Sequence, residues 1–143
     1  FGFSLLILSI LFNNILSTET ITNLKVGETF QAKNYKINFE SIDQEERQNF
    51  QSFIAKFNIE NSDGSIDILK PELRVYNQPN IITSEADIKT NLLRDKFITI
   101  NVVQNQEYFN VRYQIKPLMM WIWLSVLLIS LGGLTSLIKK KYE

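Results

Sequence analysis

Side chains that could carry acid–base, nucleophilic or metal chemistry are scarce in this sequence. Its 143 residues include neither histidine nor cysteine, which removes the commonest metal ligand, the usual proton carrier near neutral pH and all thiol chemistry. The acidic residues Asp43, Glu45 and Glu46 cluster, but amide and basic neighbours surround them, as in a polar loop. Neither a glycine-rich phosphate loop nor calcium-ligand spacing is present. We therefore expect no catalytic residue and no metal site in this chain.

One charged stretch has a pattern that suits recognition. Pro71 interrupts what would otherwise be one long strand, so it marks a bend or a sheet edge. After it Glu72, Arg74 and Tyr76 alternate, which places them on one face of a strand. The pattern predicts either a partner-docking face or a solvated face with a cross-strand ion pair, which contributes little to stability. Periodicity alone leaves both interpretations open.

The last apolar segment of the chain predicts a transmembrane helix. Residues 118–138 contain no charged residue and are long enough to cross the roughly 30 Å hydrocarbon core of a bilayer. Pro117 precedes the segment, and Trp121 and Trp123 are placed as membrane-interface anchors. Three lysines follow in the tail, residues 139–143, so the positive-inside rule predicts that this end is cytoplasmic.

A second apolar segment, residues 1–16, opens the sequence without a basic start. We expect it to be the outer part of a transmembrane helix whose beginning is missing; a truncated signal-like segment is the alternative. Residues 17–116 then lie outside the cytoplasm, between the two helices. Gly132 and Gly133 allow close helix–helix contact in lipid, which is typical of a larger bundle.

The segment between the helices predicts a mainly-β domain, a small sandwich or barrel of about seven strands. In residues 50–60 the apolar set that includes Phe53, Ala55 and Phe57 forms one strand face. Residues 61–64 predict a hairpin turn in which Gly64 supplies positive φ, and Asn105-Gln106 predict a weaker turn. One short helix is expected at 84–93, capped by Ser84. The expected strands are 28–32, 35–42, 50–60, 65–69, 73–76, 96–103 and 107–115.

The end of the chain resembles the end of the CcmF family, the haem lyase component of bacterial cytochrome c maturation. The matching pieces are Lys-Pro at 116–117, Trp-Ile-Trp-Leu at 121–124, Leu-Gly-Gly at 131–133 and Lys-Lys-Tyr at 140–142. Upstream pieces at 26–29, 71–76, 85–88 and 94–98 resemble the family in order and spacing. Family-matching positions expected to be structural are Pro71, Glu85, Asp95, Pro117, Gly132 and Gly133.

The sequence also departs from the family pattern. Ser125 replaces the usual glycine after Trp-Ile-Trp-Leu, and Val26 and Leu73 replace a proline and a lysine. Met120 replaces the arginine that often precedes Trp121, which weakens any idea that this position holds an anionic group.

The resemblance implies a role in joining haem, through its vinyl groups, to the Cys-x-x-Cys-His thiols of apocytochrome c. The family's tryptophan-rich segment and haem-handling histidines are absent from this sequence, so haem is expected only in a parent protein. The implied partners are the membrane, a haem chaperone, other maturation proteins and apocytochrome c. Nucleic acid is not expected, because acidic and basic residues balance at 15 each.

Two further alternatives remain from the sequence. A relative that serves a multihaem nitrite reductase shares these features, and a non-enzymatic membrane-tethered binding or scaffold module would fit the same topology. The implied location is the bacterial inner membrane with the β domain in the periplasm, or else the mitochondrial inner membrane.

Overall fold

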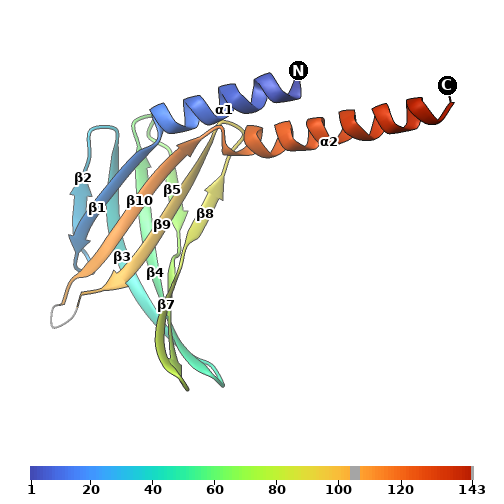
Figure 1. Ribbon diagram of the computed structural model, residues 1–143. Coiled ribbons are helices and arrows are strands. Elements are labelled where there is room, and N and C mark those ends of the chain that lie inside the picture. Colours follow the sequence, from blue (N-terminus) through green and yellow to red (C-terminus); the bar gives the residue numbers. More distant parts are fainter. Residues whose placement is uncertain (104–106, 143) are drawn as a thin grey trace. The chain divides into compact units, whose positions relative to one another are not determined.

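The computed structural model describes the backbone of residues 1–103 and 107–142 and side chains up to residue 136. Within these residues a helix stands at each end of a mainly-β chain (Figure 1). Helix α1 spans Gly2–Leu16 and helix α2 spans Met119–Tyr142. The strands between them are β1 Thr18–Leu24, β2 Thr29–Gln31, β3 Tyr35–Glu46, β4 Phe50–Asn61, β5 Ile66–Leu69, β6 Glu72–Asn77, β7 Asn80–Glu85, β8 Asp87–Thr90, β9 Arg94–Val102 and β10 Phe109–Pro117.

The chain divides into two compact units. The helix unit contains residues 1–18, 90–96 and 115–143, and the sandwich unit contains residues 19–89 and 97–114. The strands form two sheets, one in the order β1-β10-β9-β8 and the other in the order β2-β3-β4-β6-β7. Strand β5 also pairs with β4, along a different stretch of β4 from the one that pairs with β6. Pro71 lies in the break between β5 and β6, where its carbonyl accepts the Ala55 N–H at 3.0 Å, so the predicted interruption of the strand is confirmed.

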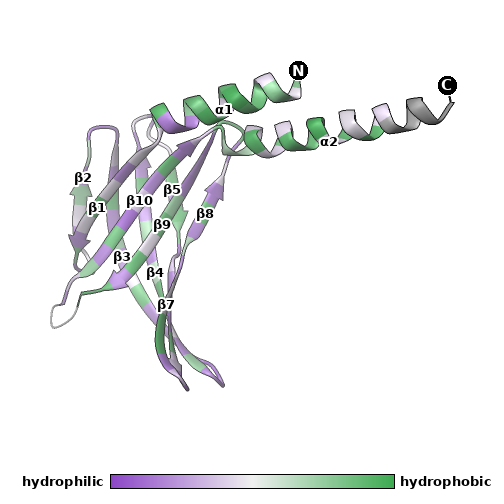
Figure 2. Cartoon of the chain, in the orientation of Figure 1, coloured by the Kyte–Doolittle hydropathy of each residue, from purple (hydrophilic) through white to green (hydrophobic). Residues whose placement is uncertain are grey.

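Aromatic side chains from both sheets fill the core of the sandwich unit. The rings of Tyr35 and Tyr113 lie 5.0 Å apart, and those of Phe39 and Phe109 lie 5.6 Å apart. Each of these pairs joins β3 in one sheet to β10 in the other, which makes the unit a sandwich rather than a barrel. Phe57 stacks on Phe39 with ring centroids 4.4 Å apart. Apolar and polar residues alternate along the strands that surround this core (Figure 2).

The strand and hairpin predicted from residue 50 onward are confirmed. The apolar set predicted for one strand face includes Ala55 and Phe57, and both are fully buried in β4. Gly64 has φ of 79° and donates its N–H to the Asn61 carbonyl at 3.0 Å, which closes the turn into β5. The turn predicted at Asn105-Gln106 lies outside the described residues.

The helix predicted at 84–93 is wrong, because strands β7 and β8 occupy this segment. The Ser84 hydroxyl, expected to cap that helix, donates instead to the Ile100 carbonyl at 2.6 Å. Asp87 accepts the backbone N–H of Lys70 at 2.6 Å. These tertiary hydrogen bonds, together with the β-branched run before Ser84, override the local helix signal.

The predicted strand count and the polar loop also need correction. The described residues contain ten strands rather than about seven, since β1, β7 and β8 were not anticipated. Asp43, Glu45 and Glu46 lie at the end of β3, paired with β4, and not in a loop. This end of β3 is exposed to solvent on both faces, so its residues are polar and lack the apolar–polar alternation that marks a strand with one buried face.

In the helix unit, α1 packs antiparallel to α2. A Cβ at Gly2 would lie 3.0 Å from Ile129, and the Asn13 amide donates to the Pro117 carbonyl at 2.6 Å. Among the described residues, only α2 is long and apolar enough to cross a membrane, over Met119–Ser136. Helix α1 is apolar but has 15 residues, which is too short to cross a membrane alone, so the described residues contain one candidate span. That α1 is the outer part of a second transmembrane helix stays a prediction.

Candidate functional site

The predicted docking residues lie together on one face of the six-stranded sheet. Pairing with β4 places Ser52 opposite Arg74 and Phe50 opposite Tyr76. Pairing with β7 places Glu85 opposite Glu72. Because directly paired residues point to the same side of a sheet, these side chains share one surface. We call this surface the β6 face; it consists of Phe50, Ser52, Glu72, Arg74, Tyr76, Ile81 and Glu85.

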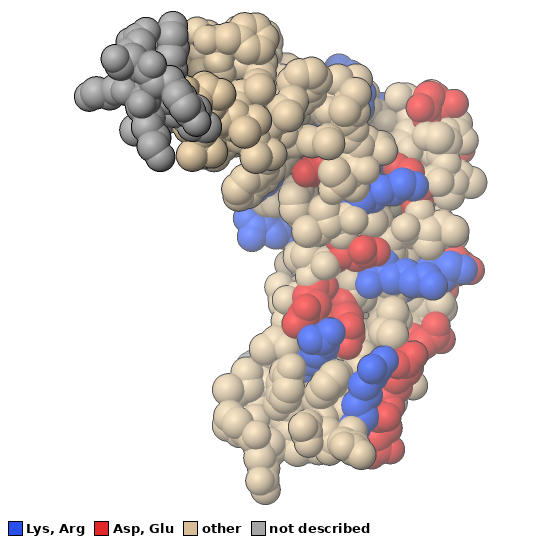
Figure 3. All heavy atoms as spheres, turned by 90° about the vertical axis from the view of Figure 1, so that its right-hand side faces the viewer, with Lys and Arg blue, Asp and Glu red and all other residues tan. Residues whose placement is uncertain are grey.

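An ion-pair network occupies the centre of the β6 face. The Arg74 guanidinium donates from Nε and Nη2 to the two oxygens of Glu72, at 2.8 and 3.2 Å. Its third nitrogen, Nη1, donates to Glu85 at 3.0 Å. The hydroxyl of Ser52, which is fully buried, donates to Glu72 at 2.5 Å. Other ion pairs join Arg47 to Glu45 and Lys56 to Glu40, and Figure 3 shows acidic and basic side chains side by side on one face of the molecule.

The network shifts the pKa of Glu72 and that of Arg74 so that both ionised forms are favoured. The Arg74 hydrogen bond lowers the pKa of the Glu72 carboxyl, burial opposes the shift, and the Ser52 hydroxyl adds to it. The Glu72 hydrogen bond in turn raises the pKa of Arg74 above its ordinary value. Glu72 is therefore ionised at neutral pH and is unsuited to general acid–base work.

Aromatic rings complete the β6 face beside the network. The Arg74 guanidinium lies 5.3 Å from the centre of the Phe50 ring, and that ring lies 5.2 Å from the Tyr76 ring. Ile81, opposite Tyr76 on β7, is 49% exposed. Three of the five guanidinium N–H groups already donate within the chain, so the face presents mainly carboxylate oxygens and apolar surface to a partner.

A second constellation joins the start of α2 to the turn between β8 and β9. The Leu118 N–H donates to the Leu93 carbonyl at 2.9 Å, and the Trp121 indole N–H donates to the Leu92 carbonyl at 2.9 Å. Leu118 has φ of 58°, a left-handed conformation that is uncommon for leucine. Trp121 thus fixes this junction, whereas Trp123 is 66% exposed.

The remaining family-matching residues have diverse surroundings. Asp95 is 7% exposed, and burial raises the pKa of its carboxyl while the Asn91 N–H opposes the shift. Glu85 belongs to the Arg74 network and Pro117 accepts from Asn13, as described above. A Cβ at Gly132 or Gly133 would meet no atom within 4 Å in the described chain, so the close helix contact expected there stays a prediction.

Several residues of these constellations were not identified from the sequence. Ser52 lies on the strand face opposite the predicted apolar set, and nothing in that pattern predicts its burial. Leu92 acts through its backbone carbonyl, which no side-chain motif reveals. Asn13 interrupts an apolar helix, and that local polarity was the one available signal of its bond to Pro117.

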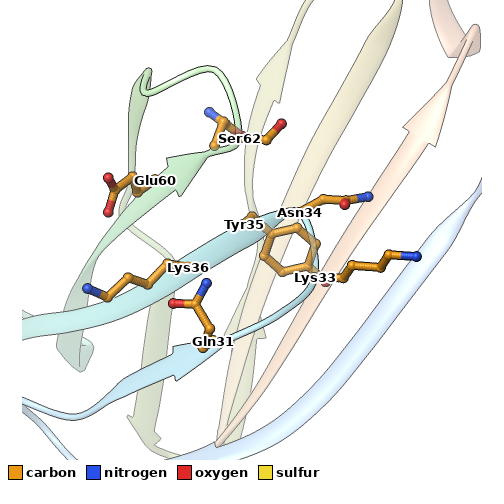
Figure 4. A pocket seen from close by; sticks show the side chains of 8 residues that line it. Gln31, Lys33, Asn34, Tyr35, Lys36, Glu60 and Ser62 are labelled. Carbon is orange, nitrogen blue, oxygen red and sulfur yellow. The ribbon is translucent and has the colours of Figure 1, made fainter.

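The described residues contain no group of three metal-ligating side chains. An open hollow of about 320 Å³ lies at one end of β3. The side chains around it diverge, and Lys33 and Lys36 point in opposite directions (Figure 4). No nucleophile is paired with a base there, so we assign it no chemistry. Its lining residues are Gln31, Lys33, Asn34, Tyr35, Lys36, Glu60, Asn61 and Ser62.

Comparison with known proteins gives one consistent result. Residues 15–117 match the family described as the CcmF C-terminal beta-sandwich. The cytochrome c-type biogenesis protein ccl1 of Rhodobacter capsulatus is 32% identical over 125 residues, which are 87% of this chain and 19% of that protein. The cytochrome c-type biogenesis protein CcmF of Pseudomonas fluorescens is 27% identical over 142 residues, 99% of this chain and 22% of that protein.

A solved structure supports the same fold. The cytochrome c heme lyase CcmF superposes with a TM-score of 0.73 at 18% identity, covering 94% of this chain and 22% of that one. The chain therefore spans about a fifth of the length of the proteins that it matches.

Proposed function

Because this chain belongs to the CcmF family, whose C-terminal β-sandwich it carries, we propose that it serves as the C-terminal part of a haem lyase for cytochrome c. The observation that carries the proposal is the match over residues 15–117, which includes every described strand of both sheets. In the reaction, each apocytochrome thiol adds across a haem vinyl group, so a carbon–sulfur bond forms and the thiol hydrogen moves to the neighbouring carbon. The chain lacks histidine and cysteine, so we assign the haem-handling groups to the rest of the protein.

The proposed topology follows from the helices and the lysine tail. Helix α2 crosses the membrane with residues 117–138, and the basic tail 139–143 lies in the cytoplasm. Residues 1–16 form the outer part of another span, and residues 17–116 form the outer domain. We place the protein in a bacterial inner membrane with this domain in the periplasm, or alternatively in a mitochondrial inner membrane.

Within this function, the outer domain offers the β6 face to a partner. Two carboxylates, Glu72 and Glu85, surround the single guanidinium of Arg74, so the centre of the face carries net negative charge. The Phe50 and Tyr76 rings next to it add apolar contact area. A charged centre beside aromatic anchors suits a partner with a basic contact surface, drawn from the haem chaperone, other maturation proteins or apocytochrome c.

Alanine at Glu72, Arg74 and Tyr76 tests the docking role. We expect the triple variant to reach the membrane at the normal level, to lose co-purifying maturation partners and to lower the yield of holocytochrome c. Unchanged co-purification and yield would show that the β6 face is only a solvated, ion-paired surface. Alanine at Lys56 and Glu40, an exposed ion pair at 2.9 Å, is the matched control.

A non-enzymatic membrane-tethered scaffold is the second candidate, favoured by the lack of haem-handling side chains in this chain. Deleting the coding segment for residues 15–117 separates the two candidates. A haem lyase predicts that covalent haem disappears from c-type cytochromes while the apocytochrome polypeptide is still made. Normal covalent haem after the deletion would overturn the proposed function.

A further inference from the structure

We propose that the turn between β8 and β9 inserts Leu92 and Leu93 into the interfacial layer of the lipid bilayer. The β8–β9 turn, residues 91–94, would thus be a second point of membrane contact beside α2. The inference rests on the proposed crossing of the membrane by α2, and it concerns a different element.

The β8–β9 turn presents two leucines where polar residues are usual. Strand β8 ends at Thr90 and β9 begins at Arg94, and the Asn91 N–H closes the turn by donating to the Arg94 carbonyl at 3.1 Å. Leu92 and Leu93 occupy the two central positions and are 62% and 61% exposed. Tight turns favour glycine, proline, asparagine, aspartate and serine at such positions, so two exposed leucines have a local cost in water.

Two hydrogen bonds fix the depth of this turn relative to α2. The carbonyls of both leucines are used, one by the Leu118 N–H and the other by the Trp121 indole, each at 2.9 Å. Both donors belong to the first residues of the membrane-spanning segment. Because an indole near a helix end favours the membrane–water interface, a turn bonded directly to it lies at the same level.

The side chains of the turn, two leucines followed by an arginine, suit contact with lipid. Leu92 and Leu93 are exposed to the same degree as Leu127 and Trp123 of α2, which are 59% and 66% exposed. The turn is hydrogen-bonded to the start of α2 and exposes apolar side chains, as the helix itself does. Arg94 follows the leucines and is exposed, at a position suited to lipid phosphate.

Site-directed fluorescence in lipid nanodiscs tests this inference. The chain has no cysteine, so L92C and L93C each introduce a single thiol in it for an environment-sensitive fluorophore. The nanodiscs contain phosphatidylcholine with a spin label at a shallow or a deep position of the acyl chain. The controls are I66C, an exposed position in the sandwich unit, and L127C in α2.

We expect the shallow spin label to quench L92C and L93C at least twofold more than I66C, and the deep label to quench L127C. Quenching of L127C alone, with both turn positions behaving like I66C, would overturn the inference and leave the topology of α2 intact. A blue-shifted emission at Leu92 and Leu93 without lipid quenching would assign the turn to a protein contact and would also overturn it. Absence of quenching at L127C would overturn the proposed span itself.

Discussion

Arg74 and Glu72 lie two residues apart on β6, and the guanidinium binds both oxygens of the carboxylate, at 2.8 and 3.2 Å. The remaining guanidinium nitrogen reaches Glu85 on the neighbouring strand. One arginine thus joins two strands, with the Phe50 ring next to it. The three side chains are therefore held in place before any partner arrives, and under the proposed docking role little side-chain entropy would be lost on binding.

Replacing Arg74 with alanine is expected to destabilise the sandwich by about 1–2 kcal/mol, because the Glu72 carboxylate keeps its partly buried position and loses two charge-assisted donors. Urea unfolding followed by circular dichroism measures the effect. Lys56→Ala is the control, since its exposed ion pair with Glu40 contributes about 0–1 kcal/mol. Equal losses for the two variants would contradict a special role for Arg74.

The ionised Glu72 carboxylate is expected to stabilise the folded protein at neutral pH, and this stabilisation should be lost in acid. Its pKa is lowered in the folded state, so the unfolded chain takes up a proton at a higher pH than the folded chain does. The stabilisation is complete above the unfolded pKa and is lost as the pH falls through the folded pKa. In thermal unfolding over a pH series, Glu72→Gln should flatten this acid limb, and an unchanged limb would contradict the prediction.

Asp95 should have the opposite effect. Burial raises its pKa, so ionisation costs stability as the pH rises from the unfolded pKa through the folded pKa. Asp95→Asn removes this cost and keeps a carbonyl oxygen that can accept the Asn91 N–H. We expect a higher melting temperature than wild type at neutral pH and an equal one in strong acid. A lower melting temperature at neutral pH would show that the charge is stabilising.

The sequence predicted strand positions best where a strand has one buried and one exposed face. Residues 50–60 alternate clearly, and Gly64 provides a turn that few other residues allow, so this hairpin was predictable. Ser84 and Asp87 predicted a helix that does not form. The hydrogen bonds that decide their structure are made with the Ile100 carbonyl and the Lys70 N–H, which are distant in sequence.

The candidate site was only partly predictable for the same reason. Alternation after Pro71 identified three members of the β6 face on one strand. Phe50, Ser52 and Glu85 come from other strands, and strand register, which a single sequence does not specify, brings them to it.

The buried ring of Phe57 should dominate the stability of the sandwich. It is fully buried and stacks on Phe39, so Phe57→Ala is expected to cost about 3–5 kcal/mol through lost burial and a cavity. Chemical denaturation with the same spectroscopic signal provides the measurement. Ile66→Ala, at a residue 63% exposed, should cost less than about 1 kcal/mol. Similar costs at the two positions would place the core elsewhere.

The two tryptophans of α2 should differ in what their indole N–H groups contribute. Trp121→Phe keeps an aromatic ring but leaves the Leu92 carbonyl without its donor at 2.9 Å. Loss of one such bond costs about 0.5–1.5 kcal/mol, which corresponds to roughly a two- to tenfold faster amide exchange at residues 91–94. Trp123 makes no side-chain hydrogen bond among the described residues, so Trp123→Phe should leave that exchange unchanged. Hydrogen–deuterium exchange of the two variants in the same nanodiscs measures the difference. Equal exchange in both would show that the indole bond does not hold the turn at the start of α2.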